Sequence, residues 1–249
     1  MARQKLGQHF LASSGILEKI ALAACGSRAE LAVEIGPGRG ALTTHLLAHA
    51  DRVIAIEIDS ALIQVLREKW PSEPRLELRQ ADALKVDFSG FGAGVLAGNL
   101  PYYAASAIIS GYLRNPGELR QGTFLIQREV AERIGAVPRT REYGYLSVEC
   151  QCLARVEFLF SVPPGAFHPP PKVDSATIRV TPVARAADLD YIKFLAFVSA
   201  CFRQKRKTLR NNLSRSYRPE ILSRSSRMSR RAEELTVEEF IELFRLLDA

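Results

Sequence analysis

The 249-residue sequence predicts an α/β fold built on a doubly wound parallel sheet. The first observation is an apolar run, a glycine-rich loop and a helical segment in that order over residues 31–50, as in a nucleotide-binding fold. The second is a series of further apolar runs at 52–59, 75–80 and 94–98, each of which ends at polar side chains. A hydrophobic content of 47% leaves enough apolar residues for a sizeable core.

The other elements follow from apolar periodicity and from turn residues. Strands are expected at 31–35, 52–59, 75–80, 94–98, 123–127, 156–162 and 176–180, the last two as an antiparallel pair at the sheet edge. Helices are expected at 14–24, 41–50, 60–70, 128–137, 144–153 and 236–247, with one more that opens near Asp190. The basic run after Cys201 is expected to continue the helix that opens near Asp190. Residues 215–231 are expected to form a mobile loop.

Composition argues against several classes of protein. No run approaches the ~18 apolar residues of a membrane span, and no apolar segment follows the basic N-terminus, so we expect a cytoplasmic protein. Cys150 and Cys152 lack a second pair that would complete a zinc site, which predicts buried free thiols. His45 and His49 have ligand spacing on a helix but no third ligand, so no metal is expected.

The net charge of +7 is concentrated near the C-terminus. Residues 201–231 contain eleven lysines and arginines against a single acidic residue, Glu220. Such an imbalance is typical of a surface that binds a nucleic acid backbone. A solvated helical face or contact with an anionic membrane remains an alternative.

The loop after the first strand, residues 36–40, reads Gly-Pro-Gly-Arg-Gly. Glycine is needed where the backbone takes a positive φ or a ligand approaches it closely. The third glycine of the dinucleotide fingerprint is replaced by Ala41, and Glu34 lies two positions before the loop. A carboxylate is unfavourable beside a pyrophosphate but favourable beside a cation. The loop therefore fits S-adenosylmethionine, with its sulfonium and ammonium groups, better than a dinucleotide.

Polar side chains follow the next three strands as well. Glu57 lies where a doubly wound fold places the acid that binds ribose hydroxyls, and Asp82 can accept a hydrogen bond from an adenine amino group. Asp59 could instead cap the next helix. Because ligands of such sheets bind outside the carboxyl ends of the strands, Gly36, Glu57, Asp82 and Asn99 are expected to meet at one site.

The stretch Asn99–Tyr102 combines a carboxamide, a rigid proline and an aromatic ring. Pro101 fixes its own φ and restricts Leu100, so that backbone carbonyls can point outward. Such a group could cradle the exocyclic amine of a base. An ordinary strand-to-helix loop with a proline start signal would have the same composition.

Eight motifs, in order along almost the whole chain, resemble those of the ribosomal RNA adenine N6-dimethyltransferases, most of all the group that modifies small-subunit RNA. They are Gln8–Leu11, Glu34–Gly40, Ala81–Ala83, Asn99–Tyr102, Gln127–Arg133, Tyr143–Val148, Phe167–Ser175 and Phe202–Leu213. The resemblance implies transfer of two methyl groups to N6 of each of two adjacent adenines near the 3′ end of the small-subunit RNA. The implied cofactor is S-adenosylmethionine, and the implied partner is an immature small ribosomal subunit bound by a monomer.

The same resemblance implies a seven-stranded Rossmann-like methyltransferase domain over residues 1–184, with an N-terminal arm at 1–12, and a small helical RNA-binding domain at 185–249. The implied cofactor contacts are Gln8, His9, Leu11, Glu34, Gly36, Gly38, Glu57, Ile58, Asp82, Ala83 and Asn99. His9 is a departure, because many relatives carry asparagine there, but both side chains can hydrogen-bond the carboxylate region of the methionine moiety. The RNA contacts predicted from the basic run are Arg203, Lys205, Arg206, Lys207 and Arg210.

The catalytic group is predicted to be Asn99, Leu100, Pro101, Tyr102 and Phe167. The N6 lone pair of adenine is delocalised into the ring and is a poor nucleophile. The Asn99 oxygen and one carbonyl of the Leu100–Pro101 turn would accept the amino hydrogens and aim the lone pair at the methyl group. Tyr102 and Phe167 would hold the unstacked base, although Phe167 could instead be an apolar plug.

Two alternatives remain open from the sequence. One is a large-subunit RNA adenine methyltransferase of the antibiotic-resistance type, which shares the core motifs. The other is a ribosome-assembly protein that keeps the fold and the basic patch without catalysis. The complete set Glu57, Asp82, Asn99 and Tyr102 favours an enzyme.

Overall fold

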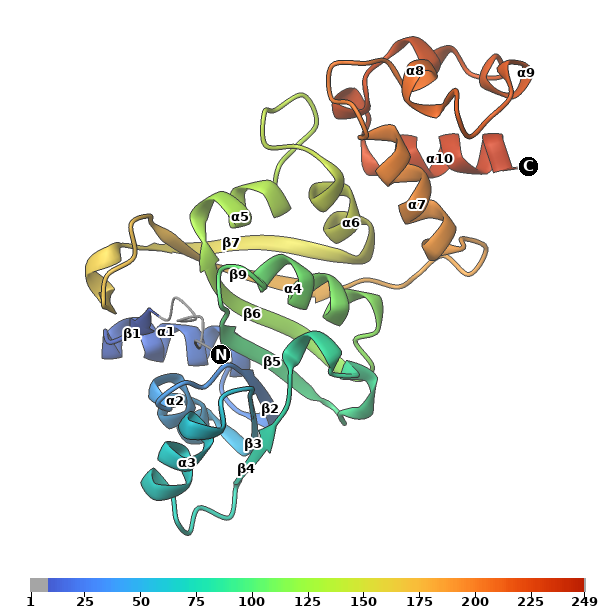
Figure 1. The fold of residues 1–249 in the computed structure, drawn as a ribbon. Helices are drawn as coiled ribbons and strands as arrows, with labels where there is room; N and C mark the ends of the chain where they lie inside the picture. Colours follow the sequence, from blue (N-terminus) through green and yellow to red (C-terminus); the bar gives the residue numbers. More distant parts are fainter. Residues whose placement is uncertain (1–8, 249) are drawn as a thin grey trace, which may run out of the picture. The chain divides into compact units, whose positions relative to one another are not determined.

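The computed structural model describes residues 9–248, and a seven-stranded sheet is its central element (Figure 1). The strands lie in the order β4-β3-β2-β5-β6-β9-β7. Their bounds are β2 Ala29–Ile35, β3 Ala50–Glu57, β4 Leu76–Gln80, β5 Gly94–Asn99, β6 Leu119–Gln127, β7 Ala154–Val162 and β9 Ser175–Pro182. The first five strands in this order run parallel, and β9 is antiparallel to β6. The α/β class and the seven-stranded sheet predicted from the sequence are confirmed.

The winding of the chain reverses at β2, which pairs with β3 on one side and with β5 on the other. In register, Glu34 of β2 lies opposite Ala97 of β5. The loops that leave the carboxyl ends of β2 and β5 therefore diverge from neighbouring points. Such a switch point opens a crevice at the edge of an α/β sheet, which is where ligands bind in this architecture.

Helix α1, Ser14–Cys25, precedes β2. The helices α2 Ala41–His49, α3 Ser60–Lys69, α4 Ala105–Arg114 and α5 Arg128–Ile134 follow β2, β3, β5 and β6. The helices α1 and α2 pack together against the sheet, where Ile20, Leu46, Val53, Val95 and Leu125 are members of one buried cluster. This apolar burial is the main stabilising contribution to the sheet that carries the crevice.

A second buried group is aromatic. The Tyr112 ring of α4 meets the rings of Phe88 and Phe124 edge to face, with centroids 5.8 and 6.3 Å apart. Its hydroxyl donates to the carbonyl of Leu119 at 2.9 Å, so the buried polar atom has a partner. A Cβ on Gly122 would lie 2.5 Å from the Phe124 ring, and only glycine leaves room for this packing.

A short two-stranded sheet joins segments that are far apart in sequence. Strand β1, Phe10–Leu11, pairs antiparallel with β8, Phe167–His168. The amide of Ala12 also donates to the carbonyl of Ala166 at 2.8 Å. This pairing ties the predicted N-terminal arm, from residue 9 onward, to the loop that follows β7.

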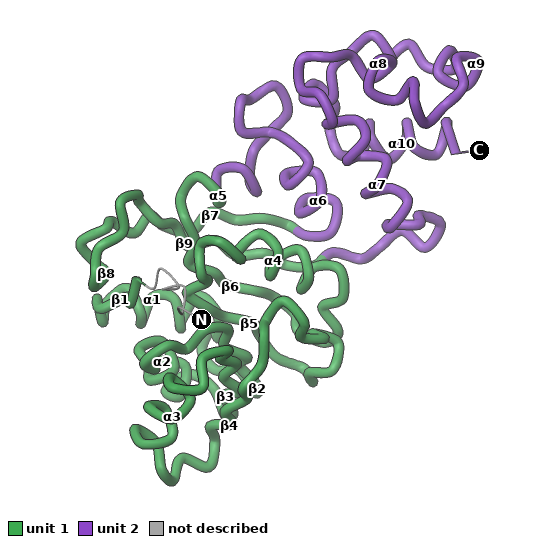
Figure 2. Tube along the Cα trace, viewed as in Figure 1, with its two compact units in different colours: residues 1–131, 155–182 green, residues 132–154, 183–249 purple. Residues whose placement is uncertain are grey.

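The chain forms two compact units (Figure 2). Unit 1 comprises the residues up to 131 together with 155–182, and unit 2 comprises 132–154 and 183–249. The sequence predicted one boundary between 184 and 185, which would leave 132–154 with the sheet. The structure differs because α6, Tyr145–Leu153, packs against the helices of the C-terminal segment.

Unit 2 is built from short helices around an aromatic core. The helices of its C-terminal segment are α7 Tyr191–Cys201, α8 Leu209–Leu213, α9 Pro219–Leu222 and α10 Val237–Asp248. The ring of Phe244 contacts Phe194 and Phe197, and that of Phe202 contacts Phe240 and Tyr143.

Two expectations for this region were wrong. Helix α7 ends at Cys201, so the basic residues from 203 to 207 lie on a turn and not on its continuation. The turn closes because Asn212 of α8 binds it through three hydrogen bonds, with Nδ2 donating to the carbonyls of Cys201 and Gln204 and Oδ1 accepting from the amide of Gln204. Residues 215–231, expected as a loop, contain α9 and a helical turn at 226–229 whose Met228 is buried.

Within the part of the chain that the structure describes, no helix combines the length and the apolar character needed to cross a membrane.

Candidate active site

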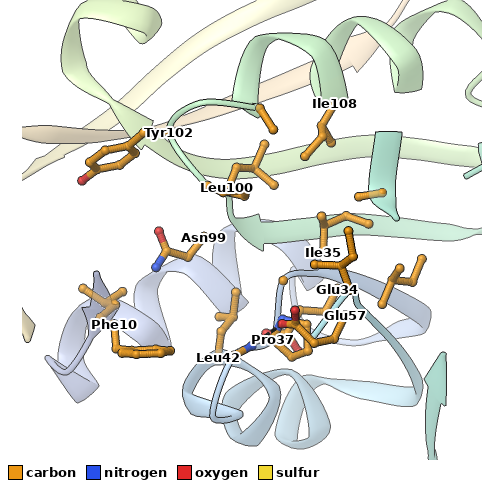
Figure 3. Close-up of a pocket in the computed structure, with 18 of the residues that line it drawn as sticks. Phe10, Glu34, Ile35, Pro37, Leu42, Glu57, Asn99, Leu100, Tyr102 and Ile108 are labelled. Atoms are coloured by element: carbon orange, nitrogen blue, oxygen red, sulfur yellow. Dashed lines mark hydrogen bonds between the residues drawn. The ribbon is translucent and has the colours of Figure 1, made fainter. Parts of the chain in front are cut away.

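One pocket lies at the carboxyl ends of β2, β3, β4 and β5, at the switch point of the sheet (Figure 3). It brings together predicted residues at the ends of these four strands and predicted residues of the N-terminal arm that contains β1. The predicted residues in its wall are His9, Leu11, Glu34, Gly36, Gly38, Glu57, Ile58, Asp82, Ala83, Asn99, Leu100, Pro101 and Tyr102. Gln8 lies outside the described residues. Phe167 does not line the pocket.

The three glycines of the loop between β2 and α2 all have a positive φ, and two of them also pack closely against aromatic rings. Gly38 has a φ of 58°, and a Cβ there would stand 3.0 Å from the Phe10 ring. Gly40 has a φ of 78°, and its Cβ would stand 2.5 Å from the ring of Trp70. Both residues thus combine a left-handed backbone with close packing, which other residue types cannot adopt without strain.

Lys69 and Trp70 support this loop from outside the pocket. The Lys69 ammonium donates to the carbonyl of Gly40 at 3.2 Å and to the Thr44 hydroxyl at 3.3 Å, and it lies 4.3 Å from the centre of the Trp70 ring. Partial burial lowers the pKa of Lys69. This support was not predictable from the sequence, because nothing in the α3 segment indicates that its end meets a loop about thirty residues earlier.

Glu34 is fully buried below the loop. Its Oε2 accepts a hydrogen bond from the Thr43 hydroxyl of α2 at 2.6 Å. Burial raises the pKa of the Glu34 carboxyl from 4.5 to about 8, and this outweighs the opposing effect of the Thr43 hydrogen bond. At pH 7 the carboxyl is therefore mostly protonated, whereas the sequence argument assumed a charged carboxylate facing a cation.

Glu57, at the end of β3, is held by two backbone amides. Gly38 N donates to Oε2 at 3.2 Å and Asp59 N donates to Oε1 at 3.0 Å. Each oxygen keeps a lone pair for a further donor. Asp59 itself caps α3 by accepting from the amide of Ala61, so its predicted alternative role is confirmed.

Asp82 follows β4 and caps a short helical turn at Ala83–Lys85. Its Oδ1 accepts from the amide of Leu84 at 3.0 Å, which fixes the carboxylate beside the pocket. Ile58 and Leu84 are half exposed and line the same wall. Two apolar side chains and one anchored acceptor form an environment suited to a heteroaromatic ring with an exocyclic amine.

Asn99, the last residue of β5, has a fixed amide orientation. Its Nδ2 donates to the carbonyl of His9 at 3.2 Å. The oxygen therefore turns the other way, and Figure 3 shows it on the Tyr102 side of the side chain, with the nitrogen on the Phe10 side. His9 is itself anchored, because its Nδ1 donates to the carbonyl of Pro169 at 2.8 Å.

The backbone after Asn99 distinguishes the two carbonyls that the sequence left open. The amide of Leu100 donates to the carbonyl of Leu125 at 3.0 Å, and the carbonyl of Pro101 accepts from the amide of Ala104 at 2.9 Å. Among the described residues, the carbonyl of Leu100 has no hydrogen-bond donor. It is the turn carbonyl left without a protein donor.

Two aromatic residues stand at the pocket. Tyr102 is partly buried, its hydroxyl lies 2.7 Å from Ser175 Oγ, and its ring centroid is 5.7 Å from that of His9. Burial raises the pKa of Tyr102, so its hydroxyl stays neutral. Tyr103 lines the pocket and is 67% exposed. Tyr103 is absent from the residues predicted from the sequence, although its place next to Tyr102 was the available signal.

The prediction that Phe167 forms a base-binding face disagrees with the structure. Phe167 is 4% exposed and belongs to the buried cluster that includes Leu11 and Leu17. Pairing with β1 sets Phe167 opposite Leu11, and this strand contact turns the side chain into the core. The Phe167 side chain therefore lies in the apolar core, as the alternative of an apolar plug proposed.

The predicted RNA contacts lie in unit 2 and are solvent exposed. They are Arg203, Lys205, Arg206 and Lys207 on the turn after α7, and Arg210 on α8. Other members of the basic run are neutralised, since Arg227 and Arg230 form ion pairs with Glu239. The charge available to an anionic partner is therefore smaller than the sequence count.

No cluster of three or more metal-ligating side chains is present in residues 9–248. His45 and His49 both bind the carboxylate of Glu18, each at 2.7 Å. All four cysteines are buried free thiols.

Comparison with known proteins identifies the family. Residues 1–249 match the family described as ribosomal RNA adenine dimethylase. The Acidobacterium capsulatum protein named ribosomal RNA small subunit methyltransferase A is 40% identical to this chain, and the match covers 99% of this chain and 91% of that protein. The Chlorobium chlorochromatii protein of the same name is also 40% identical to this chain, and the match covers 99% of this chain and 94% of that protein.

Solved structures agree with this assignment. A dimethyladenosine transferase from Plasmodium falciparum superimposes with a TM-score of 0.83 at 26% identity, covering 96% of this chain and 98% of that one. The 23S rRNA methyltransferase ErmE gives a TM-score of 0.73 at 28% identity, covering 96% and 100%. With its Rossmann-like sheet, its pocket at the switch point and a match over its full length, the chain belongs to the ribosomal RNA adenine dimethylase family.

Proposed function

We propose that this protein transfers methyl groups from S-adenosylmethionine to N6 of two adjacent adenosines near the 3′ end of small-subunit ribosomal RNA. The observation that carries the proposal is the fixed amide of Asn99, whose oxygen faces Tyr102 at the mouth of the pocket. Family membership supplies the reaction class, and the pocket supplies the groups that the reaction needs.

The residues of the pocket fit S-adenosylmethionine. The two unused lone pairs of Glu57 match the two hydroxyls of a ribose, and the anchored Asp82 can accept from an adenine amino group. The glycine loop lets the backbone approach the ligand, with Gly36 at the end of β2. When bound, this cofactor supplies an electrophilic methyl group on a sulfonium.

Asn99 and Leu100 orient the target amine. The Asn99 oxygen and the carbonyl of Leu100 are two acceptors on one turn, which matches the two hydrogens of an exocyclic amino group. Both hydrogen bonds favour a pyramidal nitrogen whose lone pair points away from the acceptors. The gain is one of orientation and electrostatics, so no strong base is required.

The base must leave its stack to reach this turn, and aromatic rings can hold it there. Tyr102 is anchored through Ser175 and offers one such face. Tyr103 takes the place that the sequence argument gave to Phe167, because it is exposed and lines the pocket.

Two observations favour small-subunit over large-subunit RNA as the substrate. The curated relatives at about 40% identity carry the small-subunit name, whereas ErmE is 28% identical. The complete pocket also favours an enzyme over an assembly protein without catalysis, because a pure binding protein has no use for the paired acceptors of Asn99 and Leu100.

Sequencing of the modified nucleotides tests the proposal. The chain is incubated with immature small subunits, or with large subunits, and with S-adenosylmethionine labelled in its methyl group. We expect dimethyladenosine at two adjacent positions of small-subunit RNA. Label confined to large-subunit RNA would refute the substrate assignment.

The Asn99→Ala variant tests the role of the amide. The turnover rate should fall by a factor of about 100 or more, since an acceptor that orients the amine is lost. Asn115→Ala, which removes an exposed asparagine bound to Asp87, is the matched control and should keep its rate. An unchanged rate for Asn99→Ala would show that the amide does not act on the amine.

A further inference from the structure

We propose that the loop Val137–Glu142 and the turn Phe202–Thr208 form one composite surface of unit 2 that binds the phosphate backbone of RNA. Arg139 and Arg141 then join the predicted contacts on the turn, although they lie more than sixty residues earlier in the sequence. This inference rests on the proposed function, because it takes RNA as the substrate.

One direct hydrogen bond joins the two segments, and a second attaches the loop to the segment before α10. The Lys205 ammonium of the turn donates to the carbonyl of Arg141 at 3.2 Å. The amide of Arg139 donates to the carbonyl of Glu233 at 2.7 Å, which attaches the loop to the segment before α10. Both segments belong to unit 2, as the shared colour in Figure 2 shows.

The loop is shaped before any partner arrives. The Thr140 hydroxyl donates to the carbonyl of Val137 at 2.7 Å, and the amide of Tyr143 donates to the carbonyl of Thr140 at 3.3 Å. The buried Tyr143 hydroxyl then donates to the carbonyl of Leu235 at 2.8 Å and fixes the end of the loop to the core. The turn is fixed independently by Asn212. A preformed surface loses less entropy on binding.

The surface carries unneutralised positive charge. Residues 139–142 and 203–207 contain six basic side chains and one acidic one, Glu142. Among the described residues, Arg139, Arg141 and Arg203 have no carboxylate partner within ion-pair distance, and neither do Arg206 and Lys207. Elsewhere in unit 2, Arg227, Arg230 and Arg245 are paired, whereas Arg215, Arg218 and Arg224 are exposed and have no ion pair among the described residues. An exposed cluster of unpaired guanidinium and ammonium groups is the arrangement that phosphate contacts use.

Arg139 also has a backbone conformation that glycine adopts with less strain. Its φ is 69°, and in the described chain it is the one residue other than glycine with a positive φ. An arginine side chain placed on a left-handed backbone is consistent with a use for the guanidinium outside the fold. The packing of the loop does not account for it, because the side chain is exposed.

Salt dependence of RNA binding tests the proposal. The dissociation constant of the full-length protein for an RNA fragment from the 3′ end of the small-subunit RNA is measured at several salt concentrations. For the double variant R139Q/R141Q, the slope of log K against log salt should shrink by about 1.4 to 1.8, since each lost phosphate contact removes about 0.7 to 0.9. R245Q, which removes a paired arginine of the same unit, should keep the wild-type slope. E142Q should bind more tightly.

R139G separates binding from folding. Glycine relieves the left-handed backbone, so this variant should be at least as stable as the wild type while its slope falls by about 0.7 to 0.9. An unchanged slope in R139Q/R141Q, beside a steep wild-type slope, would overturn the composite surface and leave the proposed function intact. Wild-type binding that does not respond to salt would contradict RNA as the partner altogether.

Discussion

The buried carboxyl of Glu34 should make the stability of the protein depend on pH in a way that Glu34→Gln abolishes. Glutamine has nearly the same shape and its oxygen can still accept from the Thr43 hydroxyl, so the variant removes the titration and keeps the packing. The pKa of Glu34 is about 8 in the folded protein, against an ordinary value of 4.5. Between these two pH values the folded state holds a proton that the unfolded chain has released.

The direction and the size of the stability change follow from this difference in pKa between the folded and unfolded states. Because the folded state binds more protons, the contribution of Glu34 to the free energy of unfolding is complete below pH 4.5 and is lost as the pH rises to about 8. A shift from 4.5 to about 8 is roughly 3.5 units, which corresponds to at most about 5 kcal/mol at 1.36 kcal/mol per unit.

Urea denaturation of wild type and Glu34→Gln between about pH 5 and pH 9 measures the effect. The difference in the free energy of unfolding between the two proteins should change by several kcal/mol over this range, and the wild type should lose stability as the pH rises. In a Thr43→Val background the loss should extend to higher pH, because the hydrogen bond that lowers the pKa of folded Glu34 is gone. Parallel pH profiles of wild type and Glu34→Gln would mean that the carboxyl is already ionised at neutral pH.

Two further substitutions test the packing around the site and the basic turn. Gly40→Ala should destabilise the protein by about 2–4 kcal/mol in denaturant titration, through its left-handed φ and the clash with Trp70, whereas Gly15→Ala in α1 meets nothing within 4 Å and should not destabilise it. Asn212→Ala leaves three hydrogen bonds unmade and should lower the free energy of unfolding by about 2–3 kcal/mol, against less than about 0.5 kcal/mol for its exposed neighbour in Asn211→Ala. Equal effects within either pair would contradict the contacts described.

The strands and the pocket were predictable from the sequence because both depend on local patterns. Buried parallel strands are continuous apolar runs, and the rule that ligands bind at their carboxyl ends needs no side-chain detail. That rule brought Gly36, Glu57, Asp82 and Asn99 to one pocket without knowledge of any distance. The charge state of Glu34 was not predictable, since it depends on the burial of the residue and not on its neighbours in sequence.

The errors arose where distant segments decide the local structure. The prolines around Phe167 suggested an exposed, rigid loop, but pairing with β1 turns the ring into the core. The basic run after Cys201 has good helix formers, yet the side chain of Asn212 folds it into a turn. Likewise, residues 132–154 belong to unit 2 because of their contacts with α7 and α10, and no composition change marks them.

The pairing of β1 with β8 has a consequence for the order in which the protein is completed during synthesis. Every residue proposed to touch the methyl donor or the target amine precedes residue 104, so these groups leave the ribosome early. The carbonyl that orients the Asn99 amide belongs to His9, however, and His9 is anchored on Pro169. A nascent chain that ends before Pro169 would contain all the reacting groups but would lack the carbonyl that anchors His9. We therefore expect competence to methylate only once Pro169 has been made.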